Sequence, residues 1–176
     1  LRSEIVIMLE RLQFIDRARI AAGITKLVEN PPTGLMIAGF SPDSGSSVRM
    51  LAEQELFAKF KSEGIDFKKN TAELFESLSA NPGSHALLVD DNSVSGSQAC
   101  AQLLAWSGVA RDRWPEEMQT ERGIEDRPLP QRDLNLLKSC NLQLGFIIGS
   151  DTAKARVEKQ ARDLRFPNIS VSYVEG

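Results

Sequence analysis

One segment of this chain carries the residue types that bind a phosphorylated ligand. It reads Asp90-Asp91-Asn92-Ser93-Val94-Ser95-Gly96-Ser97 and follows a run of apolar residues, 86–89. Small side chains and a glycine let backbone N–H groups converge on an anion at the start of a helix, where the helix dipole also favours negative charge. Adjacent carboxylates can accept hydrogen bonds from sugar hydroxyls, or hold Mg²⁺ through water. The segment therefore predicts a site for a small phosphorylated sugar or nucleotide.

The order of residue types from Ala86 to Ser97 resembles the phosphoribosyl pyrophosphate signature of type I phosphoribosyltransferases. Four apolar residues precede two acids, and a glycine follows five places after the second acid. The resemblance implies that Asp90 and Asp91 contact the ribose 2- and 3-hydroxyls, and that both approach Mg²⁺ through water. It assigns the 5-phosphate to five consecutive residues: Ser93, Val94, Ser95, Gly96 and Ser97. The pattern departs from the family at 92–95, where two apolar residues and two threonines are usual.

Family members also bind pyrophosphate in the loop after their first core strand. That loop corresponds here to residues 41–47, which follow the apolar run 34–40. Four residues of the loop and one on the next helical turn are the predicted pyrophosphate contacts: Ser41, Gly45, Ser46, Ser47 and Arg49. The family commonly has a basic residue in this loop, whereas this chain has Asp43 there.

Three functions follow from these patterns. The resemblance implies a phosphoribosyltransferase, in which a nitrogen base displaces pyrophosphate from the ribose with the help of Mg²⁺. The alternative is a sensor of phosphoribosyl pyrophosphate or a nucleotide without turnover, serving as a regulatory domain in a larger system such as those of bacterial defence. Val94 and Asp43 favour this alternative. The third is a receiver-like signalling domain, because Leu87 to Asn92 resembles the first strand of a receiver.

The elements expected to position these residues alternate between strands and helices. Short apolar runs predict strands at 34–40, 86–89 and 142–149, and alternation of apolar and polar residues predicts strands at 64–67 and 169–174. Helical spacing of apolar residues predicts helices at 2–29, 47–62, 70–79, 96–107, 134–139 and 151–164, the last capped by Asp151 and Thr152. Strands separated by single helices imply an α/β fold with a parallel sheet, Rossmann-like and similar to phosphoribosyltransferases. Ligands of such sheets bind beyond the carboxyl ends of the strands.

The length of 176 residues suits one domain. We expect residues 1–33 to be an N-terminal helical segment packed on an α/β core of residues 34–176. The stretch 109–133 is rich in charges and contains Pro115, Pro128 and Pro130, so we expect a polar surface insertion, open to an adjacent domain or partner protein.

Composition excludes several other classes of protein. A net charge of −3 argues against tight nonspecific binding of nucleic acid, which requires many basic residues. No apolar stretch approaches the roughly 20 residues of a membrane helix, and the first residues do not resemble a signal peptide. Cys100 and Cys140 lack the spacing of a zinc or redox motif. We therefore expect a cytoplasmic protein with free thiols.

Overall fold

The computed structural model describes residues 17–40, 55–81, 83–93, 95–125 and 127–175. Within these ranges, five parallel strands form one sheet in the order β2-β1-β3-β4-β5. The strands are β1 (Met36–Gly39), β2 (Asp66–Phe67), β3 (His85–Ser93), β4 (Asn141–Gly149) and β5 (Ile169–Glu175). The prediction of an α/β fold with a parallel sheet is confirmed.

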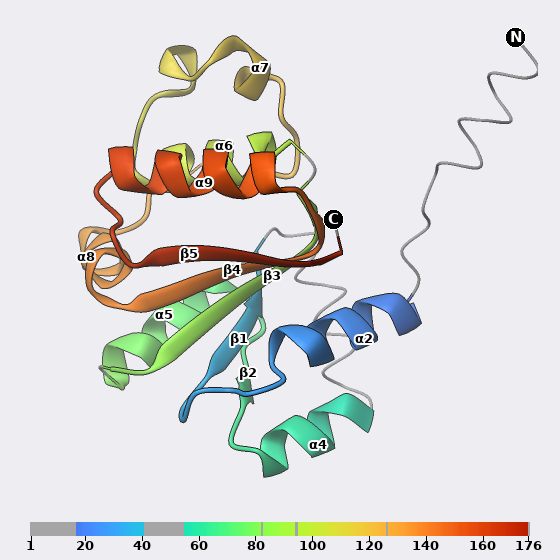
Figure 1. The fold of residues 1–176 in the computed structure, drawn as a ribbon. Coiled ribbons are helices and arrows are strands. Elements are labelled where there is room, and N and C mark those ends of the chain that lie inside the picture. The colour runs from blue at the N-terminus through green and yellow to red at the C-terminus, as the bar shows by residue number, and fades with distance from the viewer. Residues whose placement is uncertain (1–16, 41–54, 82, 94, 126, 176) are drawn as a thin grey trace, which may run out of the picture.

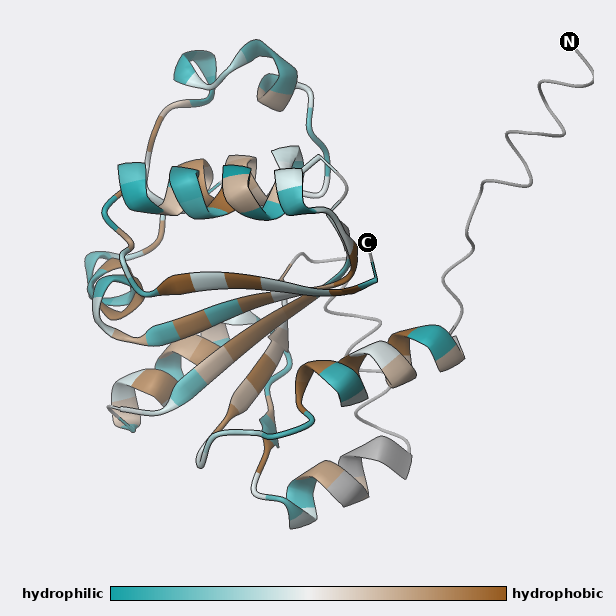
Figure 2. Ribbon diagram, viewed as in Figure 1, coloured by the Kyte–Doolittle hydropathy of each residue, from teal (hydrophilic) through white to brown (hydrophobic). Residues whose placement is uncertain are grey.

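Helices cover both faces of this sheet (Figure 1). One face carries α2 (Arg17–Leu27) and α4 (Glu55–Ser62), and the other carries α5 (Thr71–Ala80), α6 (Ser97–Trp106), α8 (Gln131–Ser139) and α9 (Asp151–Asp163). The central strands are mostly hydrophobic, whereas the outer sides of the helices are more polar (Figure 2). None of the described helices combines the length and apolar composition needed to cross a membrane.

Alternate residues of β1 face the two helical layers, which explains why its sequence is continuously apolar. Met36 and Ala38 pack on the side of α5 and α6, while Ile37 packs with Leu35, which precedes the strand, on the side of α2 and α4. All four residues of β1 are buried, as expected for a strand that is covered on both faces.

Strand β3 is longer than the apolar run that predicts it. It was expected to end before the acidic pair, but it continues to Ser93. The reason is its pairing with β4, in which Asp90 lies opposite Phe146 and Ser93 lies opposite Gly149. This pairing between distant segments keeps the polar residues extended, although their own composition favours a loop.

Part of the expected N-terminal helical segment is α2. Ile24 of α2 and Val28, which follows the helix, are buried against the sheet beside Phe60 of α4. The rest of the predicted helix 2–29 that precedes residue 17, and the first half of the predicted helix 47–62, lie outside the described residues.

The described residues of the stretch 109–133, predicted to be a polar surface insertion, are mostly exposed or half-buried, but a few of them are buried. It contains a 3-10 turn, η1 (Arg111–Arg113), and a short helix, α7 (Glu116–Gln119). Trp114 is only 3% exposed and joins Met118 in the main core. The indole N–H of Trp114 donates to the Val109 carbonyl at 2.8 Å. The segment is therefore anchored to the fold, because Trp114 and Met118 enter the core while most of its charged side chains remain exposed.

Candidate anion-binding site at the carboxyl edge

The acidic pair lies within β3, so its two side chains leave opposite faces of the sheet. Asp90 is 4% exposed and its Oδ1 accepts a hydrogen bond from the Asp91 N–H at 2.9 Å. Asp91 is exposed. The two carboxylates therefore differ in their access to a ligand, and Asp91 is the one that solvent reaches.

The edge beyond β1 and β3 is the topological switch point of the sheet. These strands are neighbours, and the Phe40 N–H donates to the Val89 carbonyl at 2.8 Å. The chain leaving β1 returns through α4 on one face, and the chain leaving β3 enters α6 on the other. Open parallel sheets bind ligands in the crevice that such a divergence creates. Both predicted phosphate loops begin at this edge.

The start of α6 is formed by Ser95, Gly96 and Ser97. Gly96 is the N-cap residue and has φ 73° and ψ 0°, in the left-handed region that favours glycine. The Ser97 N–H donates to Ser95 Oγ at 3.2 Å, and the Ser95 hydroxyl donates to Ser97 Oγ at the same distance. Because Gly96 has no side chain to cap the helix, the turn depends on these two hydroxyls.

Gly96 also permits a close approach between α6 and α9. A Cβ atom at this position would lie 3.0 Å from the Ala153 carbonyl oxygen and 3.1 Å from Val157 Cγ2. The glycine that the sequence assigns to a phosphate loop is thus required for helix packing as well.

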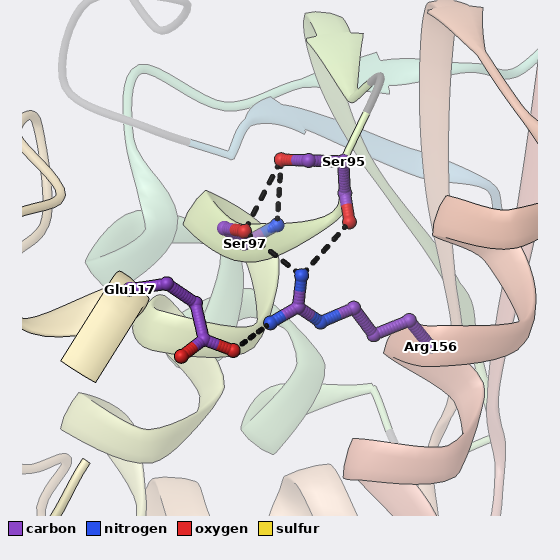
Figure 3. Close-up of polar contacts among 4 residues, drawn as sticks. All are labelled: Ser95, Ser97, Glu117 and Arg156. Carbon is purple, nitrogen blue, oxygen red and sulfur yellow. Dashed lines mark hydrogen bonds and ion pairs between the residues drawn. The ribbon is translucent and has the colours of Figure 1, made fainter. Parts of the chain in front are cut away.

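Arg156 of α9 reaches this turn, and sequence reasoning did not identify it (Figure 3). Its Nη1 donates to Ser97 Oγ at 3.0 Å and to the Ser95 carbonyl at 3.4 Å. Its Nη2 donates to Glu117 Oε1 of α7 at 2.8 Å. Arg156 and Ser97 are 59 positions apart, so no local pattern relates them. The arginine gives the predicted phosphate loop the positive charge that its own sequence lacks.

Cys100 lies one turn into α6 and is fully buried. Burial raises the pKa of its thiol to about 11, although the nearby Arg156 charge opposes this shift. The thiol is therefore protonated near neutral pH and is a poor nucleophile. Cys100 is therefore not a candidate nucleophile at this edge.

Several predicted site residues lie outside the described part of the chain. These are Val94 and the whole predicted pyrophosphate group: Ser41, Gly45, Ser46, Ser47 and Arg49. Among the predicted residues that are described, Ser93 is buried at the end of β3, and Ser95 to Ser97 follow it. In the described ranges, no three His, Cys, Asp or Glu side chains gather closely enough to hold a metal ion.

No protein-family model matches the chain, and searches of curated proteins and of solved structures find no significant match.

Proposed function

We propose that the edge beyond β3 binds phosphoribosyl pyrophosphate or a related nucleotide, in a domain similar to type I phosphoribosyltransferases. The observation that carries this proposal is the meeting of Arg156 with the Ser95–Ser97 turn, at the switch-point edge to which β3 also brings the exposed Asp91 on the opposite face of the sheet. Arginine and helix-start N–H groups favour phosphate, and a carboxylate favours sugar hydroxyls. The three features together match a phosphorylated sugar better than a free anion.

Each side chain has a separate role in the proposed complex. Ser95 and Ser97 donate their hydroxyls to the 5-phosphate, and Gly96 lets the backbone approach it. Arg156 neutralises phosphate charge. The Asp91 carboxylate accepts hydrogen bonds from the ribose hydroxyls, while the buried Asp90 fixes the Asp91 backbone through its hydrogen bond.

The residues at this edge fit Mg²⁺ as a partner of the ligand. Mg²⁺ usually retains several waters and binds one or two carboxylates together with substrate phosphates, so it does not require a cluster of three protein ligands. Asp91 would hold it, directly or through water, with Asp90 behind. When bound, Mg²⁺ would supply positive charge to the leaving pyrophosphate.

The proposed reaction is displacement of pyrophosphate from the ribose anomeric carbon by a nitrogen base. The chain's own residues would hold the two ends of the sugar phosphate so that this carbon faces the base. This role needs no protein nucleophile, in accordance with the protonated Cys100 thiol. No residue is proposed to bind the acceptor base.

A second candidate function is sensing without turnover, as a regulatory domain of a larger, defence-type system. The ion pair between Arg156 and Glu117 favours it, because this pair links the phosphate turn to the stretch 109–133. A conformational change at the phosphate turn can therefore alter the surface of the stretch 109–133. We do not propose the receiver function. It would place the acidic pair on the first strand, whereas here β1 and β2 precede β3.

Calorimetric titration with phosphoribosyl pyrophosphate and Mg²⁺ tests the proposal. We expect one saturable site in the intact domain, and a loss of affinity of about tenfold or more in Asp91→Asn, because hydrogen bonds to a charged group are stronger than neutral ones. Asp112→Asn, an exposed acid in η1, is the matched control and should bind normally. No heat of binding at millimolar ligand would refute both candidate functions.

Release of pyrophosphate separates the enzyme from the sensor. The intact domain would be incubated with phosphoribosyl pyrophosphate, Mg²⁺ and each of a set of purine and pyrimidine bases. Release that depends on one base would establish transfer. Binding without release for any base would favour the sensor.

A further inference from the structure

The short helix α7 lies across the start of α6 and is held there on two sides. On the inner side, Trp114 and Met118 are buried in the main core. Farther along, the Gln102 amide of α6 donates to the Glu125 carbonyl at 3.2 Å and accepts from the Glu125 N–H at 2.9 Å. These contacts hold the segment next to α6 independently of the ion pairs that its charged residues form.

On the outer side, Glu117 of α7 binds Arg156. The Glu117 side chain is 60% exposed and the Arg156 side chain is 31% exposed. Figure 3 shows the guanidinium between the Glu117 carboxylate and the two serines of the turn. Glu117 is therefore an anion that already pairs with the cation of the proposed phosphate site.

A cation at the start of a helix is electrostatically unfavourable, because the amino end of the helix already carries partial positive charge. Arg156 occupies this position, and the first turn of α6 contains no acidic residue. Glu117 supplies the missing negative charge from another element. A phosphate at the same turn would supply more charge and would make the same kind of paired hydrogen bonds to the guanidinium.

We propose that Glu117 competes with the ligand phosphate for Arg156. When the ligand binds, its phosphate must replace Glu117 as the partner of Arg156. This inference rests on the proposed function, since it concerns regulation of the same site. Breaking the pair between Glu117 and Arg156 costs little free energy, because exposed ion pairs contribute little to stability. The release frees the outer side of α7 while Trp114 and Met118 stay anchored, so occupancy of the turn is transmitted to the surface of the stretch 109–133.

Titration of the intact domain and of Glu117→Gln with phosphoribosyl pyrophosphate and Mg²⁺ tests this competition. We expect Glu117→Gln to bind about threefold to tenfold more tightly, because it removes a competing charge next to the phosphate. Glu116→Gln is the matched control, since it removes the same charge from an exposed position on the same helix without breaking the pair with Arg156. It should change affinity less than twofold.

A double variant shows whether the effect passes through Arg156. In an Arg156→Gln background, the further change Glu117→Gln should leave affinity unchanged, because there is no guanidinium to release. A ligand-dependent rise in hydrogen exchange at residues 116–119 of the unmodified domain is the second expected result.

The possible outcomes separate the two proposals. Equal affinities of the intact domain and Glu117→Gln, with clear binding by both, would overturn the competition and leave the proposed function standing. An equal gain from Glu116→Gln would also overturn it, since the effect would then be general electrostatics. Absence of binding by every variant would overturn the proposed function and the competition together.

Discussion

Helices α6 and α9 begin side by side at the carboxyl edge of the sheet, but their amino ends are stabilised differently. In α9, Ser150 Oγ accepts the Ala153 N–H at 3.0 Å, and Asp151 places a carboxylate in the first turn. In α6, the N-cap is Gly96, no acid lies in the first turn, and the nearest charge is the Arg156 cation. The end of α9 carries its own cap and its own anion. The end of α6 depends on an anion from elsewhere, which is why we assign the ligand to α6.

Replacement of Gly96 should have the largest effect on this difference. Gly96→Ala forces a Cβ into a left-handed residue and against the Ala153 carbonyl of α9, so we expect the free energy of unfolding to fall by about 2 to 4 kcal/mol. Gly64→Ala is the control, since Gly64 has φ +78° and nothing within 4 Å of its Cβ position. Its expected loss is about 1 to 2 kcal/mol. Equal losses in urea denaturation would contradict the close packing of α6 on α9.

Removal of the Arg156 charge should have the second largest effect. Arg156→Gln is expected to weaken binding of phosphoribosyl pyrophosphate about tenfold, because a charge-assisted pair of hydrogen bonds is lost. Arg162→Gln removes an equal charge from an exposed position of the same helix and should bind normally. Calorimetry measures both. If the two variants weaken binding to the same extent, Arg156 has no special place at the α6 turn.

The cap of α9 should matter for stability and not for the ligand. Ser150→Ala is expected to lower the free energy of unfolding by about 1 kcal/mol, the usual cost of losing an N-cap. Thermal or urea denaturation measures this loss, and ligand affinity should stay within twofold of the unmodified domain. A large loss of affinity would place the ligand at α9 instead of α6.

The smallest effect concerns Cys100, whose pKa of about 11 lies above the ordinary value of 9.0. Because the folded state favours the protonated thiol, its contribution to stability is constant below about pH 9 and is lost as the pH rises towards 11. In a Cys140→Ser background, Cys100 should react with a thiol reagent at pH 8 only after unfolding in urea. Rapid reaction in the native protein would mean that the start of α6 is more open than we describe.

The sequence was informative about elements whose signal is local. Apolar runs and alternation located the five strands of the described residues, and Asn70, which caps α5 through the Glu73 N–H, marks the start of a helix that was expected there. Positions that depend on distant partners were harder to predict. β3 continues through Asp90 and Asp91 because β4 pairs with it, and the paired residues of the two strands are 56 positions apart in the chain.

The residues of the candidate site also divide into those with a local signal in the sequence and those that depend on distant partners. The acids and the Ser95–Ser97 turn were found from their spacing, whereas Arg156 was not, since an arginine on the polar side of an amphipathic helix resembles any solvated charge. The cap of α9 was assigned to Asp151 and Thr152, but Ser150 provides it, one residue earlier. Trp114 was missed because charged neighbours conceal a single buried aromatic residue in a stretch of low hydrophobicity.

The most direct test of the assignment follows backbone amide signals by NMR during titration with phosphoribosyl pyrophosphate and Mg²⁺. The account predicts that the signals of Ser95 to Gln98 shift and saturate together, while those of Asp151 to Ala153 shift much less. No shift at millimolar ligand, or shifts at the start of α9 equal to those at α6, would contradict it.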